Sequence, residues 1–283
     1  MKTNFKWYAL FMAIGFAVVF FACQKDDVLL APETDPQIAQ DEDFSRFLGC
    51  ELTPADEYAK IDLAKDLPEP TVKGRVVLST PPIGNQGNEG SCVAWASAYA
   101  VRSILKHAQS GGSYSTSTNI FSPEYVYNQI KLGSCSAGSY PTTALNLIKS
   151  QGVSTWAVMP YSSTNGCSIQ PNSTQKANAA NYKISSYSRI TISTSNLKAY
   201  INSGKAIMVA GPVDNAFMNL KNTVLKTCSG SGGGHAYAVV GYDDAYSAFI
   251  VQNSWGTSWG VSGFGYISTS IITRLWTEAY IMN

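Results

Sequence analysis

The sequence predicts an α+β protein with a helical N-terminal lobe, a β lobe after it, and a functional site in the cleft between the lobes. Two patterns support this fold class. Between residues 92 and 151, apolar residues recur at helical spacing. Between residues 182 and 268, short apolar runs typical of strands are separated by turn residues. With 283 residues and 45% hydrophobic content, the chain can bury one sizeable core or two fused lobes.

Three helices are expected in the first half of the chain. The first runs from Cys92 to about residue 108. The second begins with Ser122 as its N-cap and Pro123 as its first residue, and continues for about ten residues. The third covers residues 141–151 and stops at Gly152, which favours a helix C-terminus.

Short strands dominate the expected second half, where turn residues bound each apolar run. These strands cover residues 182–192, 206–213, 235–242, 248–252 and 263–268, and two short helices cover 195–202 and 214–220. Residues 67–86, before the first helix, have extended character.

The N-terminus has the pattern of an export signal. Lys2 and Lys6 precede an uncharged apolar run of about 16 residues, which is shorter than the roughly 20 that a stable transmembrane helix needs. The run ends at Cys23, and Ala22 before it fits a loose bacterial lipobox. We expect residues 1–22 to be a lipoprotein signal peptide and Cys23 to carry the lipid. An uncleaved anchor and simple secretion are the alternatives.

The signal implies a cell-envelope lipoprotein, held to the outer membrane by its lipid and displayed at the cell surface if the acidic residues after Cys23 direct surface export. Residues 23–64 are rich in Asp, Glu, Pro and Ala, and we expect either a tether with one short helix or a short pro-segment over the site. Residues 65–283 would form the folded domain. The net charge of +1 and the lack of a basic stripe give no support for nucleic-acid binding, and a monomer is expected.

Cys92 is the strongest candidate for a catalytic residue. It follows a glycine-rich loop, Gln86-Gly-Asn-Glu-Gly-Ser, and begins the first helix. A thiol at a helix N-terminus lies at the positive end of the peptide dipoles, which favours the thiolate. The alternative is a structural buried cysteine, so the available partners decide between the two interpretations.

A general base for Cys92 can be found by elimination, because the chain has two histidines. His107 lies on the same expected helix, roughly 22 Å along it, and is a solvated helix-end residue. His235 begins an apolar strand after a glycine-rich run, and Asn253 follows the next strand. Adjacent strands would bring the Asn253 oxygen to the His235 ring, where it can fix the tautomer.

Two acidic residues compete with Asn253 for the role of orienting His235. Asp243 and Asp244 follow the far end of the strand that His235 begins, roughly 25 Å away if that strand is straight. We therefore interpret both as turn residues.

Three separated blocks resemble the papain-like cysteine peptidases over roughly residues 67–283. They are Asn-Gln-Gly…Gly-Ser-Cys-Val-Ala-Trp-Ala, Gly-His-Ala-Tyr-Ala-Val-Val-Gly-Tyr and Gln-Asn-Ser-Trp-Gly-Thr-Ser-Trp-Gly. The resemblance implies a two-lobed papain-like fold with an antiparallel, barrel-like C-terminal lobe. It also implies that Gln86 joins the Cys92 backbone N–H as the oxyanion hole. His235 follows Cys92 by roughly 140 residues, the family's usual separation, and Asn253 lies a little beyond it.

The chain departs from the family pattern on both sides of the site. The residues before the nucleophile are Glu89-Gly-Ser, so a cysteine and its disulfide are missing there, and Val93 replaces a tryptophan. By the resemblance, the residues expected to contact substrate are Gly138, Pro212, Ala216, Gly234 and Trp255. No acidic or basic residue is evident among them, which predicts an apolar preference in the second subsite.

The remaining cysteines are those other than Cys23 and Cys92, and they allow three disulfide pairings. The order of the helical lobe favours Cys135 with Cys167, and Cys50 with Cys228 then follows by default. No cofactor is expected. Metal binding is not expected either, because the sequence has no Cys-x-x-Cys and no histidine pair.

The function expected from these features is hydrolysis of peptide bonds in protein or peptide substrates, through a Cys92–His235 thiolate–imidazolium pair and a thioester intermediate. A transglutaminase-like acyl transferase is an alternative that Asn253 disfavours. An inert surface binding module on a peptidase fold is a second alternative, although pure binding gives no physical need for all four site residues.

Overall fold

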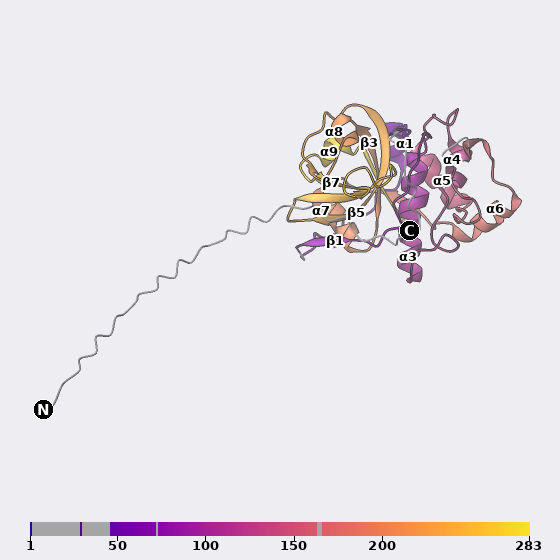
Figure 1. Ribbon diagram of the computed structural model, residues 1–283. Helices are drawn as coiled ribbons and strands as arrows, with labels where there is room; N and C mark the ends of the chain where they lie inside the picture. The colour runs from indigo at the N-terminus through magenta and orange to yellow at the C-terminus, as the bar shows by residue number, and fades with distance from the viewer. Residues whose placement is uncertain (2–28, 30–45, 72, 163–165) are drawn as a thin grey trace.

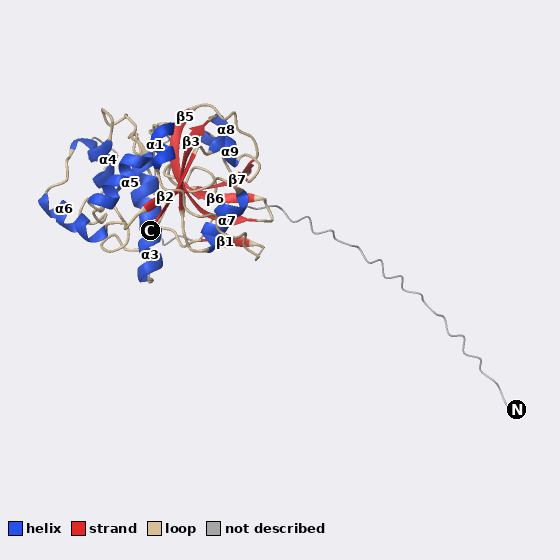
Figure 2. Ribbon diagram, turned by 180° about the vertical axis from the view of Figure 1, so that it is seen from behind, coloured by secondary structure: helices blue, strands red, loops and turns tan. Residues whose placement is uncertain are grey.

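The computed structural model describes Met1, Leu29 and residues 46–71, 73–162 and 166–283. The expected signal peptide, the lipidated Cys23 and the first half of the expected tether lie outside these residues, apart from Met1 and Leu29. Among the described residues, no helix is long and apolar enough to cross a membrane. Most helices before residue 183 gather on one side of the domain, whereas the strands lie on the other side together with the later helices, as Figures 1 and 2 show from opposite directions.

The helical elements appear close to where the sequence predicts the main ones. They are α1 (Ala55–Lys60), α2 (Cys92–Ala94), a π-helical stretch η1 (Trp95–Arg102), α3 (Ser103–Ser110), α4 (Pro123–Ile130), α5 (Pro141–Ser150), η2 (Gly166–Ser168), α6 (Ser173–Ala179), η3 (Ala180–Tyr182), α7 (Thr194–Asn202), α8 (Asn215–Met218) and α9 (Ile272–Leu275). Together α2, η1 and α3 form the expected first helix. At the start of α4, the Ser122 side chain accepts the Tyr125 amide, as its N-cap pattern predicts.

The strands form one sheet, in the order β2-β8-β3-β5-β6-β7-β4, with β1 paired to β5. Their bounds are β1 (Arg75–Val77), β2 (Tyr187–Arg189), β3 (Ile207–Val213), β4 (Val224–Leu225), β5 (Gly233–Asp243), β6 (Ala248–Gln252), β7 (Phe264–Ser268) and β8 (Glu278–Met282). All pairs are antiparallel except β4 with β7. Over the described residues this sheet is mixed and does not close into a barrel, which corrects the barrel-like lobe that the resemblance implies.

Side chains alternate between the two faces of this sheet, and each face has its own core. On β3, Met208 and Ala210 join the core shared with the helices. Ile207 and Val209 face the other core, with Trp259 and Trp276. The sequence missed β8 at the C-terminus, although it lies between β2 and β3 and is fully buried.

Candidate active site

The loop before Cys92 is buried and fixed by a hydroxyl group from the helical lobe. The Tyr161 hydroxyl lies 2.8 Å from the Gln86 carbonyl oxygen, 3.1 Å from Glu89 Oε2 and 2.7 Å from Ser91 Oγ. Glu89 Oε1 in turn accepts the Cys167 amide at 3.2 Å. This network fixes the loop directly before α2, so buried hydrogen bonds set the position of the Cys92 thiol.

Cys92 is the first residue of α2, and its side chain is fully buried. Burial raises the pKa of the Cys92 thiol to about 12, because the protein removes the water that would stabilise a thiolate. The backbone N–H groups of Ala236 and Gly49 face the sulfur and partly oppose this increase in pKa. In the conformation described here the thiol is therefore protonated at neutral pH.

His235 lies on β5, and Asn253 follows the end of β6, as the strand pairing predicts. Asn253 Oδ1 is 2.8 Å from His235 Nε2, and it also accepts the Ser254 amide at 2.8 Å. The oxygen therefore accepts from His235 Nε2–H and fixes the tautomer. His235 Nδ1 is buried and, over the described residues, has no hydrogen-bond partner, which leaves it available as a base.

The His235 ring is neutral in this conformation. Burial lowers the pKa of His235 to about 4, and the hydrogen bond to Asn253 only partly opposes this. The Trp255 ring stacks on the imidazole, with centroids 4.3 Å apart and an interplanar angle of 21°. Trp255 therefore shields the His235–Asn253 pair from water.

The Gln86 side-chain amide also lies in the candidate site, where buried hydrogen bonds fix its orientation. Its Oε1 accepts a hydrogen bond from Ser254 Oγ at 2.7 Å, which orients the amide group. Its Nε2 donates to the Glu89 carbonyl at 2.8 Å and to the Phe47 carbonyl at 3.1 Å. The Trp255 indole N–H also donates to the Phe47 carbonyl, at 3.2 Å.

The Phe47 carbonyl belongs to an extended piece of chain, residues 46–53, which we call the covering segment. Its Gly49 and Cys50 amides donate to the carbonyl oxygen of Gly234, at 3.3 and 3.1 Å. On the helical side, the Ser139 amide donates to the Gly49 carbonyl at 3.0 Å, and the Glu51 amide donates to the Ser139 carbonyl at 3.1 Å. Cys50 and Ser139 thus form a parallel bridge, and the segment spans from one lobe to the other across the thiol.

The fit of the covering segment is closest at Gly49. A Cβ on Gly49 would lie 2.1 Å from the carbonyl oxygen of Gly90, in the loop before Cys92. This distance is too short for any other residue type unless the backbone moves, so the segment is seated on the loop by backbone contact.

The structure brings Cys92, His235, Asn253 and Gln86 together. The residues expected to contact substrate differ in how closely they lie to the covering segment. The Gly234 carbonyl and Trp255 both bond to the covering segment. Gly138 lies beside it, since a Cβ there would be 2.7 Å from the Gly49 oxygen, but Ser139 makes the backbone hydrogen bonds. Pro212 is half-buried opposite Gly234, and Ala216 is exposed on α8.

Other assignments from the sequence can now be compared with the structure. His107 is on α3, where it stacks on Tyr114. Asp243 forms an ion pair with Arg75, and Asp244 with Lys198, so both are engaged away from His235.

The expected disulfide between Cys135 and Cys167 is present. The default pairing of Cys50 with Cys228 is wrong, because both are free thiols. Cys50 is held in the covering segment against the helix-facing core, whereas Cys228 packs against the core on the opposite face of the sheet. Glu89 lies near Cys135 and Cys167, the one group of possible metal ligands over the described residues, but both sulfurs are in the disulfide.

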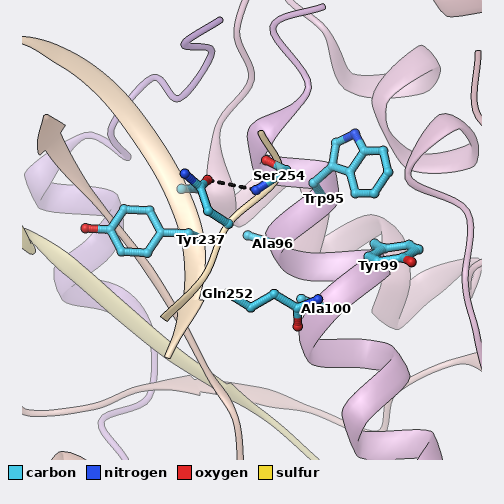
Figure 3. Close-up of a pocket in the computed structure, with 9 residues that line it drawn as sticks. Trp95, Ala96, Tyr99, Ala100, Tyr237, Gln252 and Ser254 are labelled. Atoms are coloured by element: carbon cyan, nitrogen blue, oxygen red, sulfur yellow. Dashed lines mark hydrogen bonds between the residues drawn. The ribbon is translucent and has the colours of Figure 1, made fainter. Parts of the chain in front are cut away.

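A small cavity lies behind the site, between η1 and strands β5 and β6 (Figure 3). It has about 10 Å³ of room and is lined in part by Gln252 and Asn253. The side chain of Gln252, the last residue of β6, donates to the Pro81 carbonyl at 3.0 Å. This hydrogen bond fixes the end of β6, directly before Asn253. The cavity is too small to receive a peptide.

Comparisons with known proteins agree with this geometry. The family model described as papain family cysteine protease matches residues 72–279. A curated relative, the gamete and mating-type specific protein A of Dictyostelium discoideum, is 32% identical over 192 residues. The match covers 67% of this chain and only 40% of that protein.

Solved structures show the same fold. Xylellain, a cysteine protease from Xylella fastidiosa, superimposes with a TM-score of 0.71 at 22% identity, over 87% of this chain and 98% of xylellain. The bromelain protease from Ananas comosus, solved in complex with the E64 inhibitor, gives a TM-score of 0.62 at 22% identity, over 75% of this chain and 99% of bromelain. The α+β, two-lobed fold class predicted from the sequence is therefore confirmed.

Proposed function

The chain belongs to the papain family of cysteine proteases, and on this premise we propose that it is a cysteine peptidase whose cleft is covered by its own residues 46–53. The observation that carries the proposal is the hydrogen bond between the Gln86 side chain and the Phe47 carbonyl oxygen. This oxygen accepts the Gln86 Nε2–H, the donor that an oxyanion hole would offer to a substrate carbonyl. The covering segment thus holds a peptide carbonyl at the position where the reaction needs one.

In the proposed reaction, His235 Nδ1 takes the Cys92 proton and the thiolate sulfur attacks the carbonyl carbon of the scissile bond. The negative charge on the carbonyl oxygen is stabilised by Gln86 Nε2 and the Cys92 backbone N–H. His235 then gives its proton to the leaving amine as the C–N bond breaks, which leaves a thioester on Cys92. Water, deprotonated by His235, hydrolyses the thioester, and the proton returns to the thiol.

Asn253 and Ser254 position the reacting groups without touching the substrate. The Asn253 oxygen keeps the His235 Nε2–H in place, so that Nδ1 stays the basic nitrogen. Ser254 Oγ keeps the Gln86 amide turned with its N–H groups toward the carbonyl.

The same arrangement makes the covered form inactive. With the pKa of Cys92 raised to about 12 and that of His235 lowered to about 4, both by burial, the thiol and imidazole are neutral at pH 7. Departure of the covering segment would admit water and substrate, which favours the charged pair. We therefore assign residues 46–64 to a pro-segment rather than to a tether alone.

We further propose that the substrates are proteins or peptides. We also propose that the chain is exported and held in the cell envelope by a lipid. The export signal and Cys23 lie outside the described residues, and the sequence pattern alone supports them. Incorporation of a labelled fatty acid into the chain but not into Cys23→Ala would support the anchor, and equal labelling of both would overturn it. The acyl-transferase and inert-binder alternatives are not favoured by the family match.

The peptidase proposal is tested by hydrolysis of a mixed set of quenched fluorescent peptides by the full chain, with the Cys92→Ser chain as the comparison. The proposal predicts cleavage that depends on Cys92. Equal cleavage by both chains, or none even after displacement of the covering segment, would overturn it.

A further inference from the structure

A buried acid lies in the loop before the nucleophile, at the position where the family resemblance implies a cysteine. Glu89 is 1% exposed and stands three residues before Cys92. Over the described residues, it forms an ion pair with no lysine, arginine or histidine. A buried carboxyl group is costly unless hydrogen bonds satisfy it or it keeps its proton, so its contacts indicate which form it takes.

Glu89 contacts Gln86 in two ways, directly through its backbone and through its side chain by way of Tyr161. The Glu89 carbonyl oxygen accepts the Gln86 Nε2–H at 2.8 Å. Glu89 Oε2 lies 3.1 Å from the Tyr161 hydroxyl, which donates to the Gln86 carbonyl oxygen at 2.8 Å. Glu89 therefore helps to hold both the side-chain donor of the proposed oxyanion hole and the backbone that carries it.

The Tyr161 hydroxyl group has one proton but three oxygen neighbours. They are the Gln86 carbonyl at 2.8 Å, Glu89 Oε2 at 3.1 Å and Ser91 Oγ at 2.7 Å. The carbonyl can only accept, and an ionised Glu89 can only accept as well, so the two would compete for the single Tyr161 proton. All three contacts are made together only if Ser91 and a protonated Glu89 both donate to the Tyr161 oxygen.

The other carboxyl oxygen of Glu89 also fits a neutral acid. Glu89 Oε1 accepts the Cys167 amide at 3.2 Å, as the carbonyl oxygen of an acid with its proton on Oε2 would do. Burial raises the pKa of Glu89, and the hydrogen bonds to Cys167 and Tyr161 only partly oppose this. Within the part of the chain that the structure describes, the titratable and charged groups that face Glu89 are Tyr161, Tyr127, Glu124 and Lys131.

We propose that Glu89 is a positioning residue for the oxyanion hole, and that its carboxyl proton commits the Tyr161 hydroxyl to the Gln86 carbonyl. This inference rests on the proposed peptidase function and assigns one more residue to the same site. When Glu89 gives its proton to solvent, Oε2 becomes an acceptor and takes the Tyr161 hydrogen bond, so the Gln86 backbone loses it. The Gln86 Nε2–H is then less well placed, and the chemical step slows.

Kinetics of the full chain with Gly49→Ala, which displaces the covering segment, test this role. Glu89→Ala should lower kcat by roughly tenfold or more with little change in KM. Glu89→Gln, whose side-chain amide can donate to Tyr161, should recover most of that loss. As pH rises, kcat with Glu89 should fall relative to kcat with Glu89→Gln, because glutamine cannot ionise. Tyr161→Phe should remove this difference between glutamate and glutamine.

Two other acids supply the matched controls. Glu69→Gln makes the same chemical change at an exposed acid, and Glu124→Gln makes it at a second buried acid, whose pKa is raised to about 7. The Glu89 charge is one cause of that raised pKa, so Glu89 ionises first as pH rises. Both control variants should keep the fall in kcat. A fall that Glu89→Gln retains and Glu124→Gln removes would overturn the proposal.

A carbon-13 NMR titration detects the Glu89 proton without reference to activity. Glutamate labelled at its carboxyl carbon is incorporated into the same Gly49→Ala chain, and the Glu89 resonance is the one that Glu89→Gln removes. It should titrate above 4.5, the ordinary pKa of glutamate, and with the same midpoint as the fall in kcat. A Glu89 resonance that titrates at or below 4.5 would overturn the proposal. Should Glu89→Ala fail to fold, this titration and the pH comparison with Glu89→Gln decide the question.

The two measurements separate this inference from the function on which it rests. Cleavage that depends on Cys92 but has the same pH profile with Glu89 and with Glu89→Gln would retain the peptidase and overturn the positioning role. A protonated Glu89 in a chain that cleaves no peptide would retain the order of the hydrogen bonds and overturn the peptidase proposal.

Discussion

The Gln86 side-chain amide donates a hydrogen bond to the Phe47 carbonyl oxygen at 3.1 Å, across 39 residues of sequence. The chain thereby places one of its own peptide carbonyls against the donor that the proposed reaction uses. If the proposed function holds, a substrate would compete with the covering segment for this donor, and several consequences can be measured.

Displacing the covering segment should activate the enzyme. Gly49→Ala introduces a Cβ 2.1 Å from the Gly90 carbonyl oxygen, so the segment cannot stay seated without backbone movement. We expect hydrolysis of a fluorogenic peptide to rise at least severalfold over the unmodified chain. Gly133→Ala is the control, because its Cβ would meet Ala137 at an ordinary 3.4 Å. Unchanged activity in Gly49→Ala would mean that the segment does not limit access.

Removing the amide of Gln86 should slow the chemical step. In the chain with a displaced segment, Gln86→Ala should lower kcat by roughly 10² to 10³, the usual effect of losing one oxyanion donor. Ser254→Ala should have a smaller effect in the same direction, because it only frees the Gln86 amide to turn. Thermal unfolding of both variants controls for disruption of the loop. A folded Gln86→Ala enzyme with full kcat would remove the assignment.

Asn253 should act on the reaction by orienting His235. Asn253→Ala removes the acceptor of the His235 Nε2–H, so either ring nitrogen can carry the proton. We expect kcat to fall by at least tenfold with little change in KM, and the acidic limb of the pH–rate profile to shift. Asn222→Ala, at an exposed asparagine of the β lobe, is the control. A profile identical to that of the parent chain would show that Asn253 does not orient the base.

Stability should decrease toward neutral pH through Glu124. Burial, with a contribution from the nearby Glu89 charge, raises the pKa of Glu124 to about 7 from 4.5. Between these values the folded chain binds more protons than the unfolded chain, so the contribution of this group to stability falls as pH rises from about 4.5 to 7. Tm measured from pH 5 to 8 should therefore fall more steeply for the parent chain than for Glu124→Gln. Parallel Tm curves would contradict the assignment.

The candidate catalytic residues could be brought together from the sequence because their signals are local. Cys92 follows a glycine-rich loop at a helix start. His235 lies on β5 and Asn253 directly follows β6, and these two strands are neighbours in sequence and in the sheet. The pairing of β5 with β6 then brings the ring and the amide together without further information. Gln86 belongs to the same loop as the nucleophile.

What the sequence could not predict depends on contacts between distant segments. Nothing in residues 46–53 indicates that they cross the cleft, because their partners are backbone groups and Glu278, more than 200 residues away. The last strand lacks a turn pattern that separates it from α9, so the sequence analysis did not predict it. Gly138 was expected to contact substrate, whereas Ser139 makes the backbone hydrogen bonds to the covering segment, because composition does not reveal which backbone amide faces the cleft.

The most direct test of the central claim is labelling of the full chain with a covalent peptidyl epoxide, followed by intact mass and peptide mapping. Bromelain was solved with the inhibitor E64, and we propose the same class of reagent for this chain. The account predicts one adduct, on Cys92, forming faster in Gly49→Ala than in the parent chain and lost in His235→Ala. An adduct on Cys50 or Cys228, or labelling of Cys92 at the same rate without His235, would contradict it.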